Sequence, residues 1–158
     1  MKDINDVSDD ILDVALRLHR ELGPGLLESV YEALLANRLE ALSYRVEQQK
    51  VISVEFEGAF FEAAFRADLL VDGRLLVEVK SAERLLPVHS KQLLTYLRLM
   101  KQPVGLLINF GGETLKEGVR RVVNDYNSSA PPLPSPRLRV NNPSSFPQEP
   151  DPCSTSQE

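Results

Sequence analysis

The chain has 158 residues, of which 42% are hydrophobic and 26% charged; this composition predicts one globular domain and excludes collagen, a coiled coil and full disorder. Its single cysteine, Cys153, excludes disulfide scaffolds and zinc fingers. The formal net charge of -5 is unfavourable for binding nucleic acid, whose phosphates are contacted by Lys and Arg.

Two helices are predicted first. Residues 8–22 place apolar side chains at helical spacing, with Ser8 as the expected N-cap and Gly23 as the stop. After a turn at Pro24-Gly25, the same spacing predicts a second helix over residues 26–42.

Three strands are expected next, over residues 46–56, 60–71 and 74–80, with turns at Glu57-Gly58 and Asp72-Gly73. Short turns between consecutive strands predict an antiparallel meander.

A third helix over residues 89–100 is expected before the apolar run 104–110, which is typical of a buried strand. Val119, Val122 and Val123 indicate a short final element whose type the pattern leaves open. The order helix, three strands, helix, strand predicts an α/β domain in which helices cover a mixed sheet.

The composition changes after Tyr126, because eight of the eleven prolines lie between Pro131 and Pro152. We therefore expect a domain over residues 1–126 and a Pro/Ser-rich disordered tail over residues 127–158. A proline-rich docking segment is the alternative for the tail.

The segment from Arg66 to Lys80 is the most informative for chemistry. Residues two apart on a strand share a face, so Glu78 and Lys80 point one way and the valines between and before them face the core. On the preceding strand, the apolar residues at odd positions of 65–71 are expected to share one face and leave Asp68 opposite.

The register between these two strands decides whether Asp68 meets Glu78. A regular two-residue loop at Asp72-Gly73 would pair Asp68 with Val77 and place the two carboxylates on opposite faces. A three-residue bulged loop pairs Asp68 with Leu76 and places both acids and the lysine on one face, so we predict a bulged turn.

Two carboxylates beside a lysine suit Mg²⁺ or Mn²⁺, hard cations that carboxylates, waters and phosphate oxygens hold. Lys80 could orient the attacking water or stabilise the charge that develops in the transition state. The alternative is a surface ion pair, a common fate of a Glu-x-Lys sequence on an amphipathic strand.

Two helices carry further candidates. Glu28 and Tyr31 share a helix face beside Gly25, and Glu28 could add a third carboxylate or be an ordinary solvated glutamate, with Tyr31 in the core. On the third helix, His89, Gln92 and Tyr96 form a polar stripe. Gln92 could contact substrate or a metal-bound water or instead bond a sheet edge, and His89 is better explained as a helix-start residue than as a ligand.

Five ordered motifs carry a resemblance to a known family; they lie at residues 25–31, 65–71, 77–80, 89–97 and 105–110. The first matches the signature of the GxxExxY protein family, and together they cover nearly everything from Ile11 to Asn124. This family resembles the PD-(D/E)XK nuclease superfamily, whose restriction-endonuclease-like core has the same order of elements.

The resemblance implies metal-binding acids at Asp68 and Glu78, a catalytic lysine at Lys80 and a helical acid at Glu28. It implies supporting roles for Gln92 and, less directly, Tyr96. The sequence departs from the superfamily pattern in having Ala67 rather than proline before the first acid.

The expected function is therefore Mg²⁺- or Mn²⁺-dependent hydrolysis of phosphodiester bonds in DNA or RNA. The alternative is a non-catalytic module on the same fold that binds nucleic acid or protein. Residues 80–121 carry eight basic residues against three glutamates, which form either a basic surface or scattered solvated charges. The chain could also act as a homodimer.

No membrane partner is expected, because no apolar run approaches the roughly 20 residues that a membrane helix needs. The acidic start lacks the basic and apolar regions of a secretory signal, so we expect a cytoplasmic protein.

Overall fold

The computed structural model describes residues 2–124. The expected domain end at residue 126 and the expected tail over residues 127–158 lie outside the described residues and stay predictions. Within the described range, no helix has both the length and the hydrophobicity to cross a membrane. In chain order the elements are α1 (Ile4–Leu22), α2 (Glu28–Ala41), β1 (Val46–Phe56), β2 (Ala59–Val71), β3 (Leu75–Lys80), α3 (Pro87–Met100), β4 (Val104–Asn109), the 3-10 helix η1 (Lys116–Gly118) and β5 (Val119–Val123).

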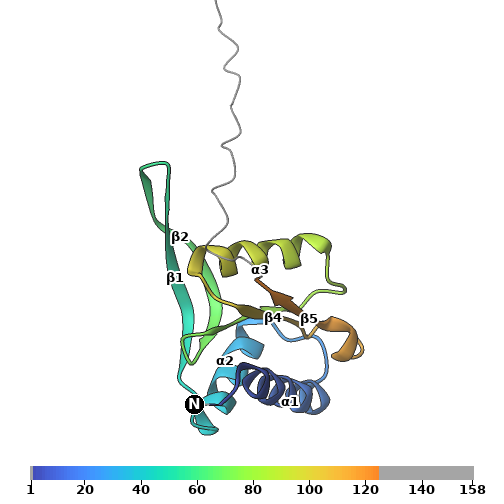
Figure 1. The fold of residues 1–158 in the computed structure, drawn as a ribbon. Coiled ribbons are helices and arrows are strands. Elements are labelled where there is room, and N and C mark those ends of the chain that lie inside the picture. The colour runs from blue at the N-terminus through green and yellow to red at the C-terminus, as the bar shows by residue number, and fades with distance from the viewer. Residues whose placement is uncertain (1, 125–158) are drawn as a thin grey trace, which may run out of the picture. The chain divides into compact units, whose positions relative to one another are not determined.

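The five strands form one sheet in the order β1-β2-β3-β4-β5. Neighbouring strands are antiparallel except β3 and β4, which run parallel and are connected through α3. The expected mixed sheet and the meander of its first three strands are confirmed. Helices α1 and α2 lie against one face of the sheet and α3 lies against the other (Figure 1).

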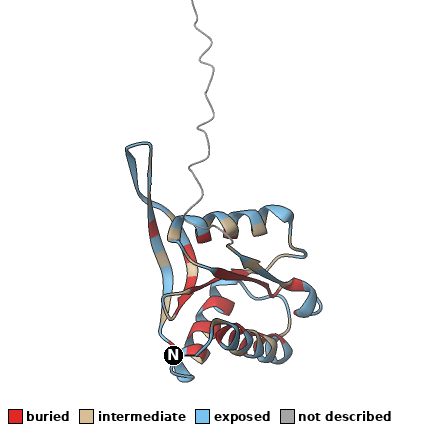
Figure 2. Ribbon diagram, viewed as in Figure 1, coloured by how far each residue is buried: buried red, intermediate tan, exposed pale blue. Residues whose placement is uncertain are grey.

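Apolar packing on both faces leaves the central strands almost without solvent contact (Figure 2). Every residue of β4 is buried, and in β3 only Lys80 is partly exposed. The cluster under α1 and α2 contains Tyr31 stacked on Phe110, with 4.3 Å between the ring centroids. The cluster under α3 contains Leu93 and Leu97. Polar side chains of β3 are therefore held between two close-packed layers.

The first helix begins earlier than expected. Asp3 is its N-cap and accepts a hydrogen bond from the Asn5 N–H at 2.8 Å, so α1 begins at Ile4. The prediction that Ser8 caps this helix was wrong, because Asp3 supplies the same capping oxygen further upstream. The Ser8 hydroxyl instead donates to the Ile4 carbonyl within the helix, at 2.8 Å.

The turn between β2 and β3 is bulged, as predicted, but in a different register. Asp72 and Gly73 have φ values of 51° and 70°, and Arg74 is the extra residue before the first pair, Val71 opposite Leu75. The expected register was wrong by two residues, because the three-residue loop consists of Asp72, Gly73 and Arg74 and not of Val71, Asp72 and Gly73. A shift of two residues keeps each side chain on its face, so the predicted meeting of the acids does not depend on it.

Candidate active site

The end of β3 holds an acid and a base side by side. Glu78 is 5% exposed, and the Lys80 ammonium donates a hydrogen bond to its Oε1 at 2.8 Å. The second carboxylate oxygen, Oε2, is buried and has no hydrogen-bond partner among the described residues. A buried carboxylate oxygen without a partner is costly, and a bound cation or a donor from a ligand would satisfy it.

Asp68 lies where β2 and β3 separate. The ladder between the two strands ends with Leu69 opposite Val77. Beyond that pair, the Val79 N–H donates to Asp68 Oδ2 at 2.8 Å. The Asp68 side chain thus accepts from a main-chain N–H of β3 that lies beyond the last strand pair. This contact brings Asp68 to the end of β3.

Strand β2 also changes face at Asp68. Leu69 packs in the cluster under α1 and α2, whereas Ala67 packs in the cluster under α3. The expected single apolar face over residues 65–71 was therefore wrong, because side chains two apart share a face only in an uninterrupted strand. The neighbouring strand is irregular at the same level: Gln49, which lies between the pairs Gln48–Leu69 and Lys50–Ala67, has a left-handed φ of 49°.

The charges at this site are unbalanced. Burial raises the pKa of Asp68 and of Glu78 above the ordinary carboxyl range, and the charge of Asp68 raises the pKa of Glu78 further. Burial alone would lower the pKa of Lys80, but its hydrogen bond to Glu78 and the nearby carboxylates outweigh burial and raise it. The lysine is therefore an ammonium at neutral pH, and one ammonium faces two carboxylates, the buried Glu78 and the half-buried Asp68.

Glu28 approaches the same end of β3 from the first turn of α2. Its Oε1 accepts a hydrogen bond from the Ser81 N–H at 3.0 Å, and the Ser81 hydroxyl donates to the Leu26 carbonyl at 2.7 Å. These two contacts join the entrance of α2 to the residue after Lys80. Glu28 therefore helps to fix the position of the strand end that carries the buried ion pair.

Tyr31 holds the loop that precedes Glu28. Its hydroxyl donates to the Gly23 carbonyl at 2.5 Å and accepts from the Leu26 N–H at 3.3 Å. Between them Gly25 has a φ of 115°, a conformation that residues with a Cβ rarely adopt. The three spaced residues Gly25, Glu28 and Tyr31 thus shape and fasten one turn beside the strand end.

Two further polar residues, which the sequence analysis missed, face Asp68. The Gln49 Nε2 donates to Glu32 Oε2 at 2.8 Å and lies 3.4 Å from Asp68 Oδ1. Glu32 is buried, and burial raises the pKa of its carboxyl. It lies one helical turn after Glu28, a spacing that could have indicated it, whereas no sequence signal marks Gln49.

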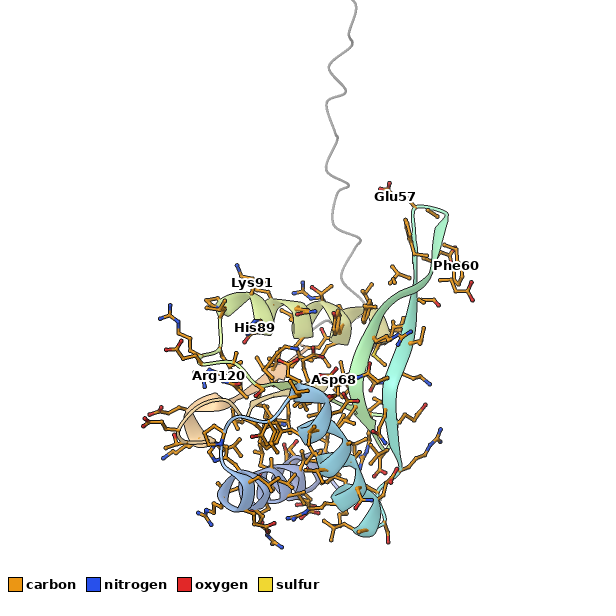
Figure 3. All side chains as sticks on the ribbon, turned by 180° about the vertical axis from the view of Figure 1, so that it is seen from behind. Glu57, Phe60, Asp68, His89, Lys91 and Arg120 are labelled. Atoms are coloured by element: carbon orange, nitrogen blue, oxygen red, sulfur yellow. The ribbon has the colours of Figure 1, made fainter. Side chains whose placement is uncertain are left out.

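These residues surround an open pocket of about 570 Å³ beside the first turn of α2. Figure 3 shows Asp68 at this position. The pocket is lined by Leu26, Leu27, Glu28, Ser29, Glu32, Gln49, Asp68 and Ser81.

Comparison with known proteins identifies the family. The sequence profile of the PD-(D/E)XK nuclease superfamily matches residues 5–122. The chain belongs to this superfamily. Its helices and mixed sheet are consistent with the restriction-endonuclease-like fold of PD-(D/E)XK proteins. No curated protein matches the chain by sequence.

A solved structure also resembles this PD-(D/E)XK domain. It is titled "Crystal structure of SSO0001" and has 16% sequence identity and a TM-score of 0.42 to this chain. The similarity covers 75% of this chain and 67% of that chain.

The three predicted α3 residues of this PD-(D/E)XK domain make local contacts away from the acids. His89 Nδ1 accepts the Leu86 N–H at 3.2 Å, which makes His89 part of the helix start, as the sequence favoured. The Gln92 amide donates to the Tyr96 hydroxyl, and the Tyr96 ring stacks on the Phe65 ring with 3.9 Å between their centroids. Among residues 2–124, no hydrogen bond joins these three polar residues to the acids at the end of β3.

The PD-(D/E)XK fold implies a divalent metal, and two acidic side chains of this chain fit such an ion. Within the described part of the chain, no group of three or more acidic, His or Cys side chains is arranged to hold a metal. Glu28 Oε1 accepts the Ser81 N–H, and its expected role as a third metal-binding acid stays a prediction. The two strand acids, one of them with a free buried oxygen, fit a hard cation whose other ligands are waters and substrate oxygens.

Proposed function

We propose that this PD-(D/E)XK superfamily member is a metal-dependent nuclease that hydrolyses phosphodiester bonds in DNA or RNA. The observation that carries the proposal is the buried Glu78 carboxylate: one oxygen accepts from Lys80, and the other, near Asp68, is unpaired within the described part of the chain. Surface ion pairs do not bury a carboxylate in this way. The buried acid favours a catalytic role over a solvated strand pair.

In this proposal Asp68 and Glu78 hold Mg²⁺ or Mn²⁺. When bound, the cation would activate the attacking water and neutralise charge on the phosphodiester. The Val79 N–H and the Gln49 amide orient the Asp68 carboxylate. Both acids carry raised pKa values because of burial, so a divalent cation relieves a repulsion that the fold itself builds.

Lys80 acts as a cation in this scheme. Its raised pKa keeps it protonated, so it stabilises negative charge on the phosphate and orients the water. Glu28 keeps the strand end in place through Ser81 and adds negative charge beside the metal-binding pair. Gln92, with Tyr96 and His89, would then take a supporting part from α3 on the substrate side.

We also propose that the chain is of the GxxExxY type within the superfamily. Gly25, Glu28 and Tyr31 stand at the spacing of that signature, and each makes a contact or adopts a conformation that shapes the turn before α2. These contacts give a physical reason for the spacing.

The test is cleavage of labelled single-stranded, duplex and branched DNA and RNA with Mg²⁺ or Mn²⁺. Wild type is compared with Asp68→Asn, and Asp13→Asn, at an exposed position of α1, is the matched control. Metal-dependent cleavage by wild type and the control, but not by Asp68→Asn, supports the proposal. Metal-independent binding without cleavage by all three proteins would instead indicate a non-catalytic binding module.

A further inference from the structure

Strands β1 and β2 continue beyond the rest of the sheet. Strand β3 pairs with β2 only at Leu69, Leu70 and Val71, whereas β1 pairs with β2 as far as the turn at 57–58. Residues 50–67 therefore form a two-stranded arm that extends past α3, on the side of the helix away from the sheet (Figure 1). A two-stranded hairpin is marginal in water by itself, so the arm calls for a further surface.

The arm carries apolar side chains that the domain does not cover. Phe60 is 67% exposed and Phe61 54%, both close to the turn, and Val51 is exposed further down the arm. Figure 3 shows Phe60 on the outside of the arm. Adjacent exposed aromatic rings on a projecting element are typical of a surface that binds another protein.

The charge near the tip excludes nucleic acid as the favoured occupant. Residues 54–63 contain Glu55, Glu57 and Glu62 and no lysine or arginine. Within residues 2–124 these three glutamates form no ion pair. An acidic tip repels phosphates and fits a basic protein surface.

The outer side of α3 is such a surface. Lys91 and Arg98 lie two helical turns apart, and their side chains form no ion pair with another described residue. Val88 and Leu99, at the two ends of the helix, are 57% and 43% exposed. Figure 3 shows Lys91 on the side of α3 away from the sheet.

The arm cannot cover the helix of its own chain. Phe65 stacks on Tyr96 at 3.9 Å, which fixes the base of the arm against the flank of α3. From that point the tip projects away from the outer face of the helix (Figure 1). The arm is acidic and aromatic, and the outer side of α3 is basic and apolar. These two complementary surfaces therefore lie on one chain without contacting each other.

We propose that the chain forms a reciprocal homodimer in which the arm of each copy packs its tip on α3 of the other. Phe60, which shares its strand face with Glu62, contacts an apolar end of the partner helix, and Glu57 and Glu62 pair with its lysine and arginine. A two-fold arrangement uses both surfaces twice and leaves neither exposed. This inference concerns assembly and does not rest on the proposed activity.

The test is the molar mass in solution, measured by sedimentation velocity over the micromolar range. One variant reverses the arm, Glu57→Lys with Glu62→Lys, and the other reverses the helix, Lys91→Glu with Arg98→Glu. The proposal predicts a dimeric wild type, two monomeric variants, and dimers again when the two variants are mixed in equal amounts. Mixing restores both contacts, because each reversed arm meets a reversed helix and each native arm meets a native helix.

Each other result overturns the proposal. A wild type that is monomeric over the whole range contradicts it, and so do variants that dimerise alone or that stay monomeric when mixed. Thermal unfolding of each variant tests that it is folded. The double variant Phe60→Ser with Phe61→Ser, which leaves the charges intact, should also be monomeric. If helix reversal abolishes binding of labelled nucleic acid without changing the mass, the face of α3 serves nucleic acid instead.

Discussion

Glu78 and Lys80, two residues apart on β3, form a buried ion pair in which the lysine bonds one carboxylate oxygen, while the other has no partner among residues 2–124. The pair lies at the end of a strand whose other side chains are packed on both faces. Because Asp68 adds a second, half-buried acid, the site has an excess of negative charge. This excess underlies the following predictions.

Divalent metal should stabilise the fold through the two strand acids. We expect Mg²⁺ or Mn²⁺ to raise the melting temperature of wild type. When the free metal concentration is a hundredfold above the dissociation constant, the free energy of unfolding rises by roughly 2.7 kcal/mol. Asp68→Asn should lose the shift and Asp13→Asn should keep it, as differential scanning fluorimetry would show. The shift should also weaken as pH falls through the raised pKa values of Asp68 and Glu78, because the acids must be ionised to bind metal. An equal shift in Asp68→Asn would place the metal elsewhere.

Glu32→Gln should stabilise the protein at neutral and higher pH. Burial raises the pKa of Glu32, so its ionised form costs folding free energy above that pKa, and the cost disappears as pH falls and the carboxyl is protonated. The amide keeps an acceptor for the Gln49 Nε2 and carries no charge. Melting curves should therefore show the variant above wild type at pH 8, with the difference shrinking as the solution is acidified. A variant less stable than wild type at pH 8 contradicts this assignment.

Gln49 should affect metal affinity more than stability. Its amide contacts both Glu32 and Asp68, and its left-handed backbone is a conformation that glycine adopts freely. We expect Gln49→Gly to weaken metal binding by roughly 10–100-fold, as loss of groups that orient metal ligands does, while stability changes little. Titration calorimetry with Mn²⁺ measures the affinity. Gln49→Asn, which keeps an amide and tolerates a positive φ, should retain more of it; equal losses in both variants would count against the hydrogen bonds.

Tyr31→Phe should loosen the turn before α2. The variant keeps the ring stacked on Phe110 but loses the hydroxyl contacts with Gly23 and Leu26. We expect a loss of roughly 0.5–1.5 kcal/mol in denaturant unfolding, the usual net value of such a bond. Cleavage should fall as well, since the turn positions Glu28. Full activity in the Phe variant would show that the turn does not need this anchor.

The order and type of the elements could be predicted because hydrophobic spacing and turn residues are local signals. The predicted bounds of β1 agree with the structure, since Val46 follows a break and Glu57-Gly58 ends the strand. The start of α1 was missed because two capping residues, Asp3 and Ser8, compete for one role. The expected final element of open type is a strand, β5, because it pairs with the buried β4.

The candidate site could be predicted in part. The strand periodicity was enough to pair Glu78 with Lys80, and the bulged turn was enough to expect Asp68 nearby. The change of face at Asp68 and the role of Gln49 could not be foreseen, because a left-handed glutamine inside a strand has no sequence signature. The contact between Glu28 and Ser81 joins distant segments and depends on the tertiary fold.

The most direct test of the central claim is the rate of metal-dependent cleavage by Lys80→Ala, on the substrate that wild type cleaves best. Lys116→Ala, at an exposed position of η1, is the matched control. The account predicts a loss of at least about 100-fold for Lys80→Ala, the size expected when a group that stabilises transition-state charge is removed, and an unchanged rate for the control. Lys80→Arg, which keeps the charge beside Glu78, should remain folded and recover part of the rate. A Lys80→Ala protein that binds metal and cleaves as fast as wild type would contradict the account.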